Sequence, residues 1–469
     1  MATHAVVIGA SMAGLCAARV LTRFFDRVTL LDRDELPDGA ESRAGVPQGR
    51  HVHALITRGA HELERLFPGF LAEYTQRGAH ELDVTRDGAV LRACGWQRPM
   101  ASGQPVYFAT RGLTESIVRR RTLALPAIEL LQRCEVAGLL VRPDDPARVR
   151  GVRLNWRGHA SGPAEIEADL VVDAGGRASK APEWLSELGR PAPREEVVDA
   201  GAGYSSRWYE GPDPARTPAD HWWKLIWLDP APPAQLLGGV LFPVEGGRFI
   251  VTLIGYSRHF PPSDEDGFDA ALQTLRSPVL ARAVAASRPV SPVYSYRGLV
   301  NRLRRFDELA DPAPGFVALG DSVCTFNPMY GQGMTIATLC VAALEDTLGR
   351  VSADDPAFPR AFFKSQARSV RDAWALATGA DMLFPATRSE RPPPSRLVRM
   401  FSSAIRLGMN NDEQILRRVT PIYYLLRPNR ELFDRRLAAR IVAVAAREVA
   451  RTKLLRAAPT EMPPPRSAP

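Results

Sequence analysis

Residues 5–34 combine an apolar run, a turn of small residues, a helical stretch and a second apolar run that ends in an acid. They read AVVIGASMAGLCAARVLTRFFDRVTLLDRD. This order is typical of a βαβ unit that binds a dinucleotide. Gly9 permits the tight turn after the first strand, and Gly14 lets the helix pack closely on the sheet. The alternative is a doubly wound sheet with a chance turn of small residues.

The signature differs from the full glycine pattern at one position. Ser11 stands where the middle glycine is usual, so the motif is G-x-S-x-x-G. Ser11, Met12 and Ala13 open the helix, where unpaired N–H groups and the helix dipole favour a pyrophosphate. Asp32, at the end of the second apolar run, is placed to accept a hydrogen bond from a ribose hydroxyl.

Length and cysteine usage limit the class of protein. A chain of 469 residues has the length of two to three domains. The first apolar run is already a strand of the nucleotide fold, so we expect no signal peptide, and no apolar stretch approaches the ~20 residues of a spanning helix. We expect a cytoplasmic protein with buried, reduced cysteines and neither disulfides nor a metal site. The cysteines are Cys16, Cys94, Cys134, Cys324 and Cys340.

A second nucleotide signature lies far along the chain. In GFVALGDSV a buried strand precedes Gly320 and Asp321, and NPMYGQGM follows. An acid at a strand end suits hydrogen bonding to a ribityl hydroxyl. A helix starting at Gly331, Gly333 and Met334 can direct N–H groups at a developing negative charge. Two such separated elements imply FAD more than NAD.

The pattern of apolar runs predicts an α/β protein. We expect a Rossmann-like FAD-binding domain, an inserted antiparallel-sheet substrate domain and a C-terminal helical region. Helices are predicted at about 52–66 and 113–123. The expected parts are residues 1–189 (FAD-binding, with a short substrate-side insertion at about 76–105), 190–300 (substrate sheet), 301–352 (FAD-binding return), 353–457 (helical) and 458–469 (disordered tail).

Six segments carry a resemblance to a known family: GASMAG, LLDRD, SRAGVPQGRHVHAL, TRGLTESIVRR, VVDAGGRAS and ALGDSVCTFNPMYGQGM. With them the chain resembles the single-component FAD-dependent monooxygenases of the aromatic-hydroxylase fold. It is similar in particular to the squalene-epoxidase-like branch and to the bacterial flavin epoxidases of polyether biosynthesis. The resemblance extends over almost the whole chain.

The resemblance implies which residues hold FAD. These are Asp32 and Arg33 at the adenosine ribose, Arg43 and Arg111 near the pyrophosphate, Val136 at the adenine, Asp321 at the ribityl chain and Met334 beside the pyrimidine end of the ring. The two arginines agree with the chemistry of the ligand, because a planar guanidinium suits phosphate geometry.

The resemblance also implies the reaction. It consists of FAD reduction, reaction with O₂ to a flavin C4a-hydroperoxide, and transfer of one oxygen to an apolar secondary-metabolite substrate. Alkene epoxidation is preferred and aromatic hydroxylation is the alternative. No side chain is identified as a catalytic acid or base. Residues 173–179 depart from the D-G-x-x-S-x-x-R segment that also serves NADPH, so either NADPH visits transiently or a separate flavin reductase supplies electrons.

Aromatic residues in the strands of 190–300 form either a pocket wall or ordinary sheet packing. They are Trp222, Trp223, Trp227, Phe242, Phe249 and Tyr256. Few charges interrupt these strands, which favours an apolar substrate. His51 and His53 would point apart on a helix, which predicts a helix-start or packing role and no shared metal.

The net charge of +8 comes from the C-terminal region. Residues 388–469 carry 17 Lys and Arg against 7 Asp and Glu. No nucleic-acid motif accompanies this excess, so we expect a solvated helical face and no nucleic-acid partner. Attraction to an anionic carrier protein or peripheral contact with a membrane surface is the alternative.

Other functions remain on the same fold. A flavin-dependent halogenase usually carries W-x-W-x-I-P, which HWWKLIWLDP does not match. A flavin-dependent prenyl reductase would saturate a double bond without consuming O₂. A binding protein without redox turnover is the non-enzyme alternative, and the phosphate and ribityl elements argue against it.

Overall fold

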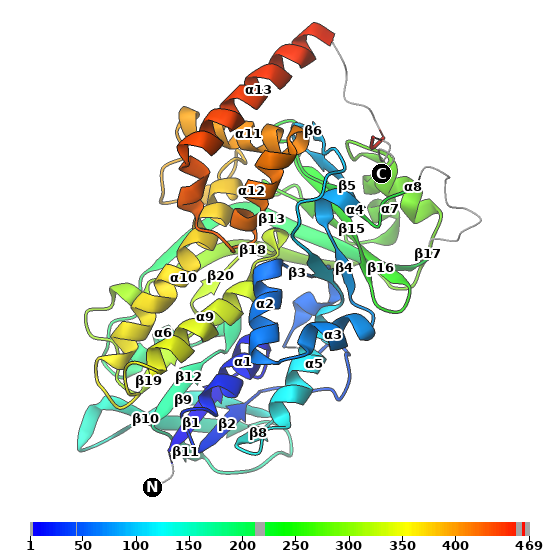
Figure 1. Ribbon diagram of the computed structural model, residues 1–469. Coiled ribbons are helices and arrows are strands. Elements are labelled where there is room, and N and C mark those ends of the chain that lie inside the picture. The colour runs from blue at the N-terminus through cyan, green and yellow to red at the C-terminus, as the bar shows by residue number, and fades with distance from the viewer. Residues whose placement is uncertain (1–2, 44, 212–220, 456–461, 465–469) are drawn as a thin grey trace.

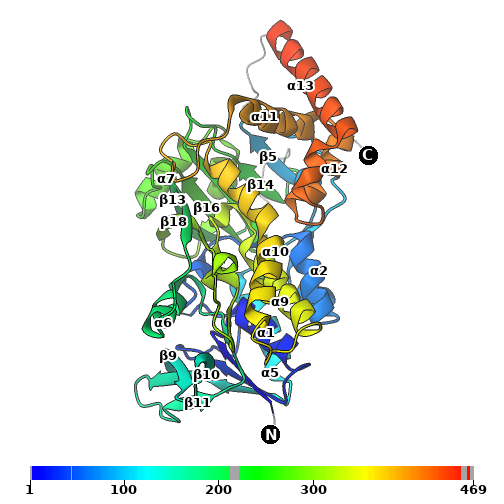
Figure 2. The same cartoon turned by 90° about the vertical axis from the view of Figure 1, so that its left-hand side faces the viewer.

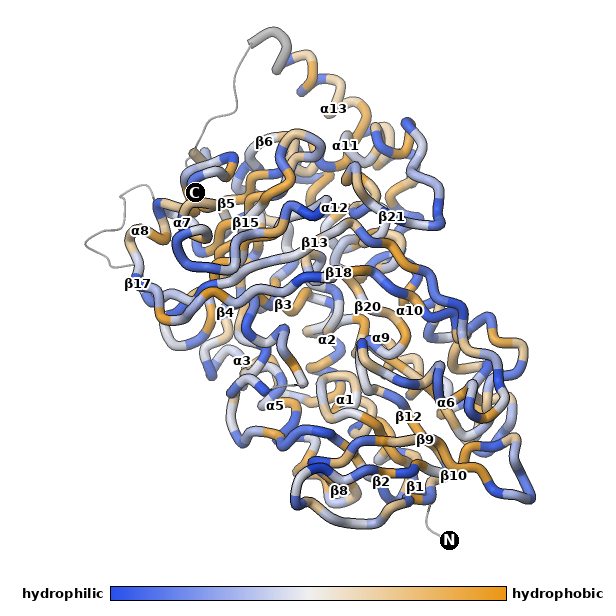
Figure 3. The backbone as a smooth tube through the Cα atoms, turned by 180° about the vertical axis from the view of Figure 1, so that it is seen from behind, coloured by the Kyte–Doolittle hydropathy of each residue, from blue (hydrophilic) through white to orange (hydrophobic). Residues whose placement is uncertain are grey.

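A five-stranded parallel sheet with the order β19-β12-β1-β2-β8 carries the N-terminal motif. In the computed structural model, which describes residues 3–43, 45–211, 221–455 and 462–464, this sheet lies at the lower end of the molecule (Figure 1). Its central strands are mainly apolar and buried, as expected for a parallel sheet covered on both faces (Figure 3). The strands are β1 (His4–Ile8), β2 (Arg27–Leu31), β8 (Ile128–Leu131), β12 (Leu170–Asp173) and β19 (Phe316–Ala318).

Helices cover one face of the parallel sheet and a small antiparallel sheet lies against the other. Helix α1 packs on β1 and β2 and contacts α5 and α9, whereas β10 contacts β12. Figure 2 shows β9, β10 and β11 on the side away from α1. The elements are α1 (Met12–Leu21), α5 (Arg111–Leu123), α9 (Gly333–Leu348), β9 (Cys134–Arg142), β10 (Asp145–Trp156) and β11 (Glu165–Glu167). The helix predicted at 113–123 is therefore α5, and it begins two residues earlier.

A large mixed sheet forms the middle of the molecule, with the order β20-β18-β13-β16-β15-β14-β5-β6 and with β17 and β21 paired to β13. All pairs are antiparallel except β14 with β5. The sheet therefore also takes strands from before residue 190 and after residue 300. The strands are β5 (Gly88–Arg92), β6 (Gly95–Trp96), β13 (Glu195–Glu210), β14 (Leu225–Leu228), β15 (Leu237–Val244), β16 (Arg248–Gly255), β17 (Arg288–Pro289), β18 (Tyr294–Arg304), β20 (Cys324–Thr325) and β21 (Arg388–Ser389).

The segment between the two sheets is less helical than the sequence predicts. Helix α2 begins at Thr57, not near residue 52, because Ala54 and Leu55 pair with β7 as a short strand and residues 47–50 form a 3₁₀ turn. This pairing joins segments that are distant in sequence, so the residues near 52 do not indicate it. The elements here are β3 (Ala54–Leu55), α2 (Thr57–Leu66), α3 (Phe70–Gln76), β4 (His80–Leu82), α4 (Val84–Asp87) and β7 (Val106–Phe108). Short helices α6 (Ala181–Glu187), α7 (Glu265–Gln273) and α8 (Val279–Ala285) flank the sheets.

In the described part of the chain, four α-helices follow α9. They are α10 (Phe358–Asp381), α11 (Arg396–Asn411), α12 (Glu413–Tyr423) and α13 (Arg435–Leu455). Helix α10 packs on α9, while α11, α12 and α13 share a separate apolar core at the upper end of the molecule (Figures 1 and 2). No helix in the described part of the chain has the length and apolarity that a bilayer crossing requires. Of the tail predicted at 458–469, only 462–464 lies within the described residues.

The cysteines are free, and one differs from expectation. Cys16, Cys134, Cys324 and Cys340 are buried, as predicted for small apolar side chains. Cys94 is exposed, because it lies in the turn between β5 and β6 at the edge of the large sheet.

We predict that Gly14→Ala strongly destabilises the protein. A Cβ on Gly14 would lie 1.7 Å from the Gly9 carbonyl oxygen, so α1 would have to move off the turn, at a cost of at least about 2 kcal/mol. In the helix interior at Gly379, a Cβ would meet nothing within 4 Å, so Gly379→Ala should gain up to about 1 kcal/mol. Urea unfolding of both variants measures the contrast. A Gly14→Ala protein as stable as the parent would contradict this account of the packing.

Candidate functional site

One cavity of about 900 Å³ connects the parallel sheet with the C-terminal helices. Its walls come from the start of α1, the end of β2, Arg43 and the segment 45–56, the start of α9 and the inner face of the large sheet. Among the predicted site residues, Gly14 and Gly320 do not line it. Those that do are Gly9, Ser11, Met12, Ala13, Asp32, Arg33, Arg43, Arg111, Val136, Asp321, Gly331, Gly333 and Met334.

The two remaining glycines act behind the wall, where they allow close packing. Gly14 lies against the Gly9 carbonyl, and Gly9 itself has a φ of +96°, which a side chain would oppose. Gly320 has a φ of +63°, and a Cβ there would lie 2.9 Å from the Ala13 side chain. These contacts hold the second signature directly against the first turn of α1.

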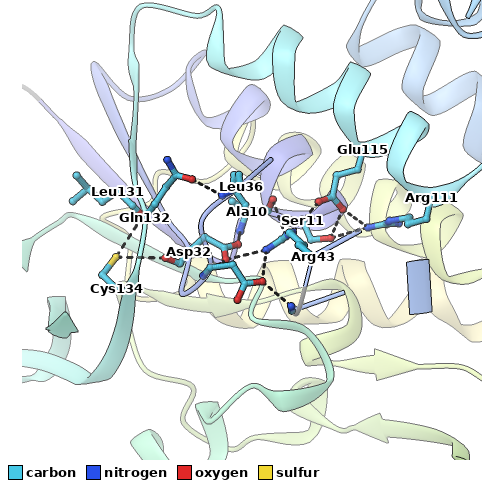
Figure 4. A network of polar contacts seen from close by, with 12 residues as sticks. Ala10, Ser11, Asp32, Leu36, Arg43, Arg111, Glu115, Leu131, Gln132 and Cys134 are labelled. Atoms are coloured by element: carbon cyan, nitrogen blue, oxygen red, sulfur yellow. Dashed lines mark hydrogen bonds and ion pairs between the residues drawn. The ribbon is translucent and has the colours of Figure 1, made fainter. Parts of the chain in front are cut away.

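A buried network of acids and arginines forms the α1 end of the cavity (Figure 4). Arg43 Nη1 donates to Asp32 Oδ1 (3.0 Å) and Asp34 Oδ2 (3.1 Å). Its Nε donates to Glu115 Oε1 at 3.3 Å. Asp32 also accepts from the backbone N–H of Ala10 (2.8 Å). The loop at residue 43 is thus fixed to the end of β2 and to α5.

Glu115 connects the second arginine to the same network. Arg111 Nη2 donates to Glu115 Oε2 (2.8 Å) and to Ser11 Oγ (2.7 Å). The Ser11 hydroxyl donates to Glu115 instead of capping α1. Burial alone would raise the pKa of Glu115, but the charges of Arg111 and Arg43 overcome this effect and lower it. Sequence reasoning did not select Glu115, although its position four residues after Arg111 on one helix face could have done so.

Asp321 faces the cavity without a hydrogen-bond partner among the described residues. Burial raises the pKa of its carboxyl group, while Arg177, Arg111 and Arg302 act in the opposite direction. Nearby, a Cβ on Gly333 would meet nothing within 4 Å, so the start of α9 is open to a ligand. An unpartnered carboxylate, an open helix start and two arginines fit the sugar and phosphate groups of a dinucleotide such as FAD.

Residues 173–179 form a turn that also lines the cavity. Asp173 is fully buried, and its Oδ1 accepts from the backbone N–H of Gly175 (2.8 Å). Arg177 donates to the carbonyls of Gly298 and Val300, which joins the turn to β18. This segment, which departs from the family pattern, is therefore a turn that the Asp173 carboxylate stabilises.

The aromatic residues of the large sheet divide between its two faces. Trp227 and Phe242 line the cavity, with ring centroids 5.7 Å apart. The other candidates, Trp222, Trp223, Phe249 and Tyr256, do not line it. Trp223 and Phe249 belong to the apolar cluster under α7 and α8. Trp227 and Phe242 therefore form a pocket wall, whereas Trp223 and Phe249 take part in ordinary sheet packing.

His51 and His53 lie in the loop before α2, so the expectation of a helical pair is wrong, because the β3–β7 pairing displaces the helix start. His51 is buried on the cavity wall, and its Nδ1 lies 2.8 Å from Ser206 Oγ. Burial lowers the pKa of His51 to about 3, with further contributions from His53 and Arg50. Burial and Arg111 lower the pKa of His53 to about 4. Both imidazoles are therefore neutral at physiological pH.

The opposite end of the cavity contains charged residues that the sequence analysis did not select. Arg92 is the last residue of β5, Asp229 follows β14, and Arg406 lies on α11. They come from three distant segments, and no motif joins them. Only the pairing of β14 with β5 and the position of α11 bring them together.

Comparison with known proteins agrees with this geometry. No family model matches the chain. Protein Rv3254 of Mycobacterium tuberculosis is 34% identical over 398 residues, covering 83% of this chain and 82% of that protein. The flavin-dependent brominase Bmp2 has a TM-score of 0.64 at 15% identity, covering 96% of this chain and all of that one. PqsL of Pseudomonas aeruginosa, named a probable FAD-dependent monooxygenase, has a TM-score of 0.58 at 17% identity, with coverages of 90% and 100%. The expected α/β fold class is confirmed.

We predict that His51 makes the protein sensitive to acid. The folded imidazole stays neutral to about pH 3, whereas the unfolded chain binds a proton near the ordinary pKa of ~6.5, so the free energy of unfolding falls as the pH drops through this window. His51→Gln should remove about 2 kcal/mol of the loss between pH 7.5 and pH 5. Urea unfolding at both pH values tests this, with the exposed His159→Gln as control. Equal losses in His51→Gln and the parent would contradict the burial of a neutral imidazole.

Proposed function

The chain belongs to the family of Protein Rv3254 of Mycobacterium tuberculosis, and from this premise and its fold we propose that it is an FAD-dependent monooxygenase. The observation that carries the proposal is the convergence of two distant sequence signatures on one cavity. The start of α1 with Asp32, Arg43 and Arg111, and Asp321 with the start of α9, line the same wall.

In this proposal the α1 end of the cavity holds the adenosine and pyrophosphate. The first turn of α1 offers backbone N–H groups, and Arg43 and Arg111 offer guanidinium groups. Asp32 accepts from a ribose hydroxyl, and Val136 lies at the adenine. Asp321 accepts from the ribityl chain. Bound FAD, once reduced, supplies the electrons that activate O₂.

The protein's own contribution to the reaction is positioning and exclusion of water. The start of α9 offers N–H groups for negative charge on the reduced ring. Trp227, Phe242 and Val240 give the large sheet an apolar face on the substrate side. Such a wall keeps water from the reacting atoms and orients an apolar chain. Oxygen transfer to an alkene depends more on such a dry, shaped pocket than on a proton shuttle, so we assign no side chain as an acid or base.

We assign epoxidation of a carbon–carbon double bond as the reaction, with aromatic hydroxylation as the second candidate. The resemblance to squalene-epoxidase-like enzymes and the apolar wall at Trp227 and Phe242 support this choice. The electrons come from transient NADPH or from a separate flavin reductase. The substrate is a small apolar molecule of secondary metabolism, free or bound to a carrier protein.

We predict that Arg111→Ala lowers FAD occupancy more than Arg111→Lys. Alanine removes both the charge and the planar fork, whereas lysine loses only the fork. The dissociation constant of FAD should rise roughly tenfold or more for alanine. Flavin content at 450 nm and quenching of FAD fluorescence measure this. Arg120→Ala on the same helix, whose exposed side chain pairs with Glu73, serves as control. Equal FAD affinity in all four proteins would remove the phosphate contact from the proposal.

We predict incorporation of one ¹⁸O atom from ¹⁸O₂ into the product. The assay supplies FAD, NADPH with and without a flavin reductase, and polyenes, terpenoids or aromatic compounds, and it reads product mass. A labelled epoxide supports the assigned reaction, and a labelled phenol supports the second candidate. A product heavier by two hydrogen atoms and free of label would contradict monooxygenation and indicate a reductase.

A further inference from the structure

The end of the cavity farthest from α1 carries a small polar cluster in an otherwise apolar wall. Arg92, Asp229, Arg406, Tyr423 and Tyr424 all line the cavity there. Figures 1 and 2 show that β5, α11 and α12 lie at the upper end of the molecule, opposite to β1 and β2. Apolar side chains of Val84, Ile405 and Met409 line the cavity around the cluster.

The cations of this cluster exceed its carboxylates. Arg92 Nη1 lies 3.7 Å from Asp229 Oδ2, and its buried Nε has no hydrogen-bond partner in the described chain. Asp229 also accepts a hydrogen bond from Trp227 Nε1 (2.7 Å). Arg406 donates only to Ser403 Oγ (3.3 Å), and no carboxylate of the described residues lies within 4 Å of it. Asp229 is therefore the only carboxylate of the described residues within 4 Å of either guanidinium group.

Two hydroxyl groups lie beside the arginines. Burial raises the pKa of both hydroxyls, and the charges of Arg406 and Arg92 oppose this effect at Tyr423. At Tyr424 the charge of Asp83 raises the pKa further, and Arg92 acts in the opposite direction. Both tyrosines thus remain protonated and able to donate. Neither hydroxyl has a hydrogen-bond partner among the residues that the structure describes. The cluster therefore offers donors from Arg406, Arg92 and both tyrosines, with Asp229 already engaged.

We propose that this cluster binds a carboxylate at one end of an otherwise apolar substrate. This inference rests on the proposed function, because the substrate occupies the same cavity as the flavin. The apolar wall at Trp227 and Phe242 would take the hydrocarbon part, and Arg406 would take the carboxylate in a bidentate contact. The charged end fixes how far the chain reaches toward the start of α9, and so which carbon atoms meet the flavin.

A carboxylate fits the charge of the cluster better than a phosphate does. Among the cluster residues that line the cavity, Arg92 and Arg406 against Asp229 leave one positive charge. Behind them Arg276 also acts on Asp229 and Asp83 acts on Tyr424, and these two opposite charges offset each other, so a carboxylate neutralises the cluster. A phosphate monoester carries nearly two negative charges near pH 7 and would leave Asp229 with uncompensated repulsion. An alcohol or ester would give the half-buried Arg406 guanidinium no anionic partner and would forgo the charge-assisted contact. The expected substrates are therefore unsaturated, apolar monocarboxylic acids.

The test compares one acid with its neutral ester. cis-Parinaric acid, an 18-carbon tetraene whose fluorescence rises in an apolar site, and its methyl ester are titrated into the purified full-length protein. The acid should bind roughly tenfold or more tightly than the ester. Arg406→Gln should weaken acid binding by a similar factor and leave ester binding unchanged. Arg417→Gln is the matched control, because Arg417 on α12 pairs with Glu413 and does not line the cavity.

The outcomes separate this inference from the proposed function. Equal binding of acid and ester, loss of both in Arg406→Gln, or binding of neither to the parent protein would each overturn the carboxylate site. The conservative variant Arg406→Lys keeps the positive charge and should recover part of the preference for the acid. Flavin content at 450 nm is measured on the same samples. A protein that prefers the acid but never binds FAD would contradict the proposed function and leave the carboxylate site standing.

Discussion

The buried ion pairs around Glu115 are the constraint on which the α1 end of the cavity depends. One carboxylate on α5 holds both Arg111 of its own helix and Arg43 of a loop far away in sequence. It also accepts a hydrogen bond from Ser11 at the start of α1. Removing one member of such a network leaves a buried charge without its partner, which costs far more than the intact pair contributes. The segment 45–56, with His51 on the cavity wall, follows Arg43 and is held beside these contacts by the hydrogen bond from Gly45 N–H to Asp34.

Close packing at glycines also stabilises the α1 end of the cavity. The approach of α1 to Gly9 and of the turn at Gly320 to Ala13 brings two signatures, about 300 residues apart in sequence, against one another. A parallel sheet makes this possible, because the ends of β1, β2, β12 and β19 lie along one edge. The large sheet then covers this edge, and its inner face supplies the apolar wall. The cavity exists because two sheets meet there with α9 between them.

Local sequence patterns were sufficient to predict the start of the parallel sheet and its first turn. Gly9 and Asp32 lie in one short βαβ unit whose spacing has few alternatives, so the first strand, helix and strand could be predicted. The resemblance, not the spacing, identified Arg43 and Arg111 as neighbours. The start of α2 was missed because the pairing of Ala54 and Leu55 with β7 is decided by distant residues. Arg92 and Arg406 were missed for the same reason, since only the assembled sheet and α11 bring them to one cavity wall.

The charge balance differs between the two ends of the cavity. At the α1 end Arg43 is shared among Asp32, Asp34 and Glu115, and these ion pairs hold its guanidinium in place at the wall that is proposed to take the pyrophosphate. At the α11 end Arg406 has no such partner among the described residues, and Arg92 has one at 3.7 Å. The half-buried Arg406 guanidinium therefore remains available to a ligand. An anionic group of the substrate would supply its missing partner, so this end of the cavity can select a charged substrate in addition to the flavin proposed at the α1 end.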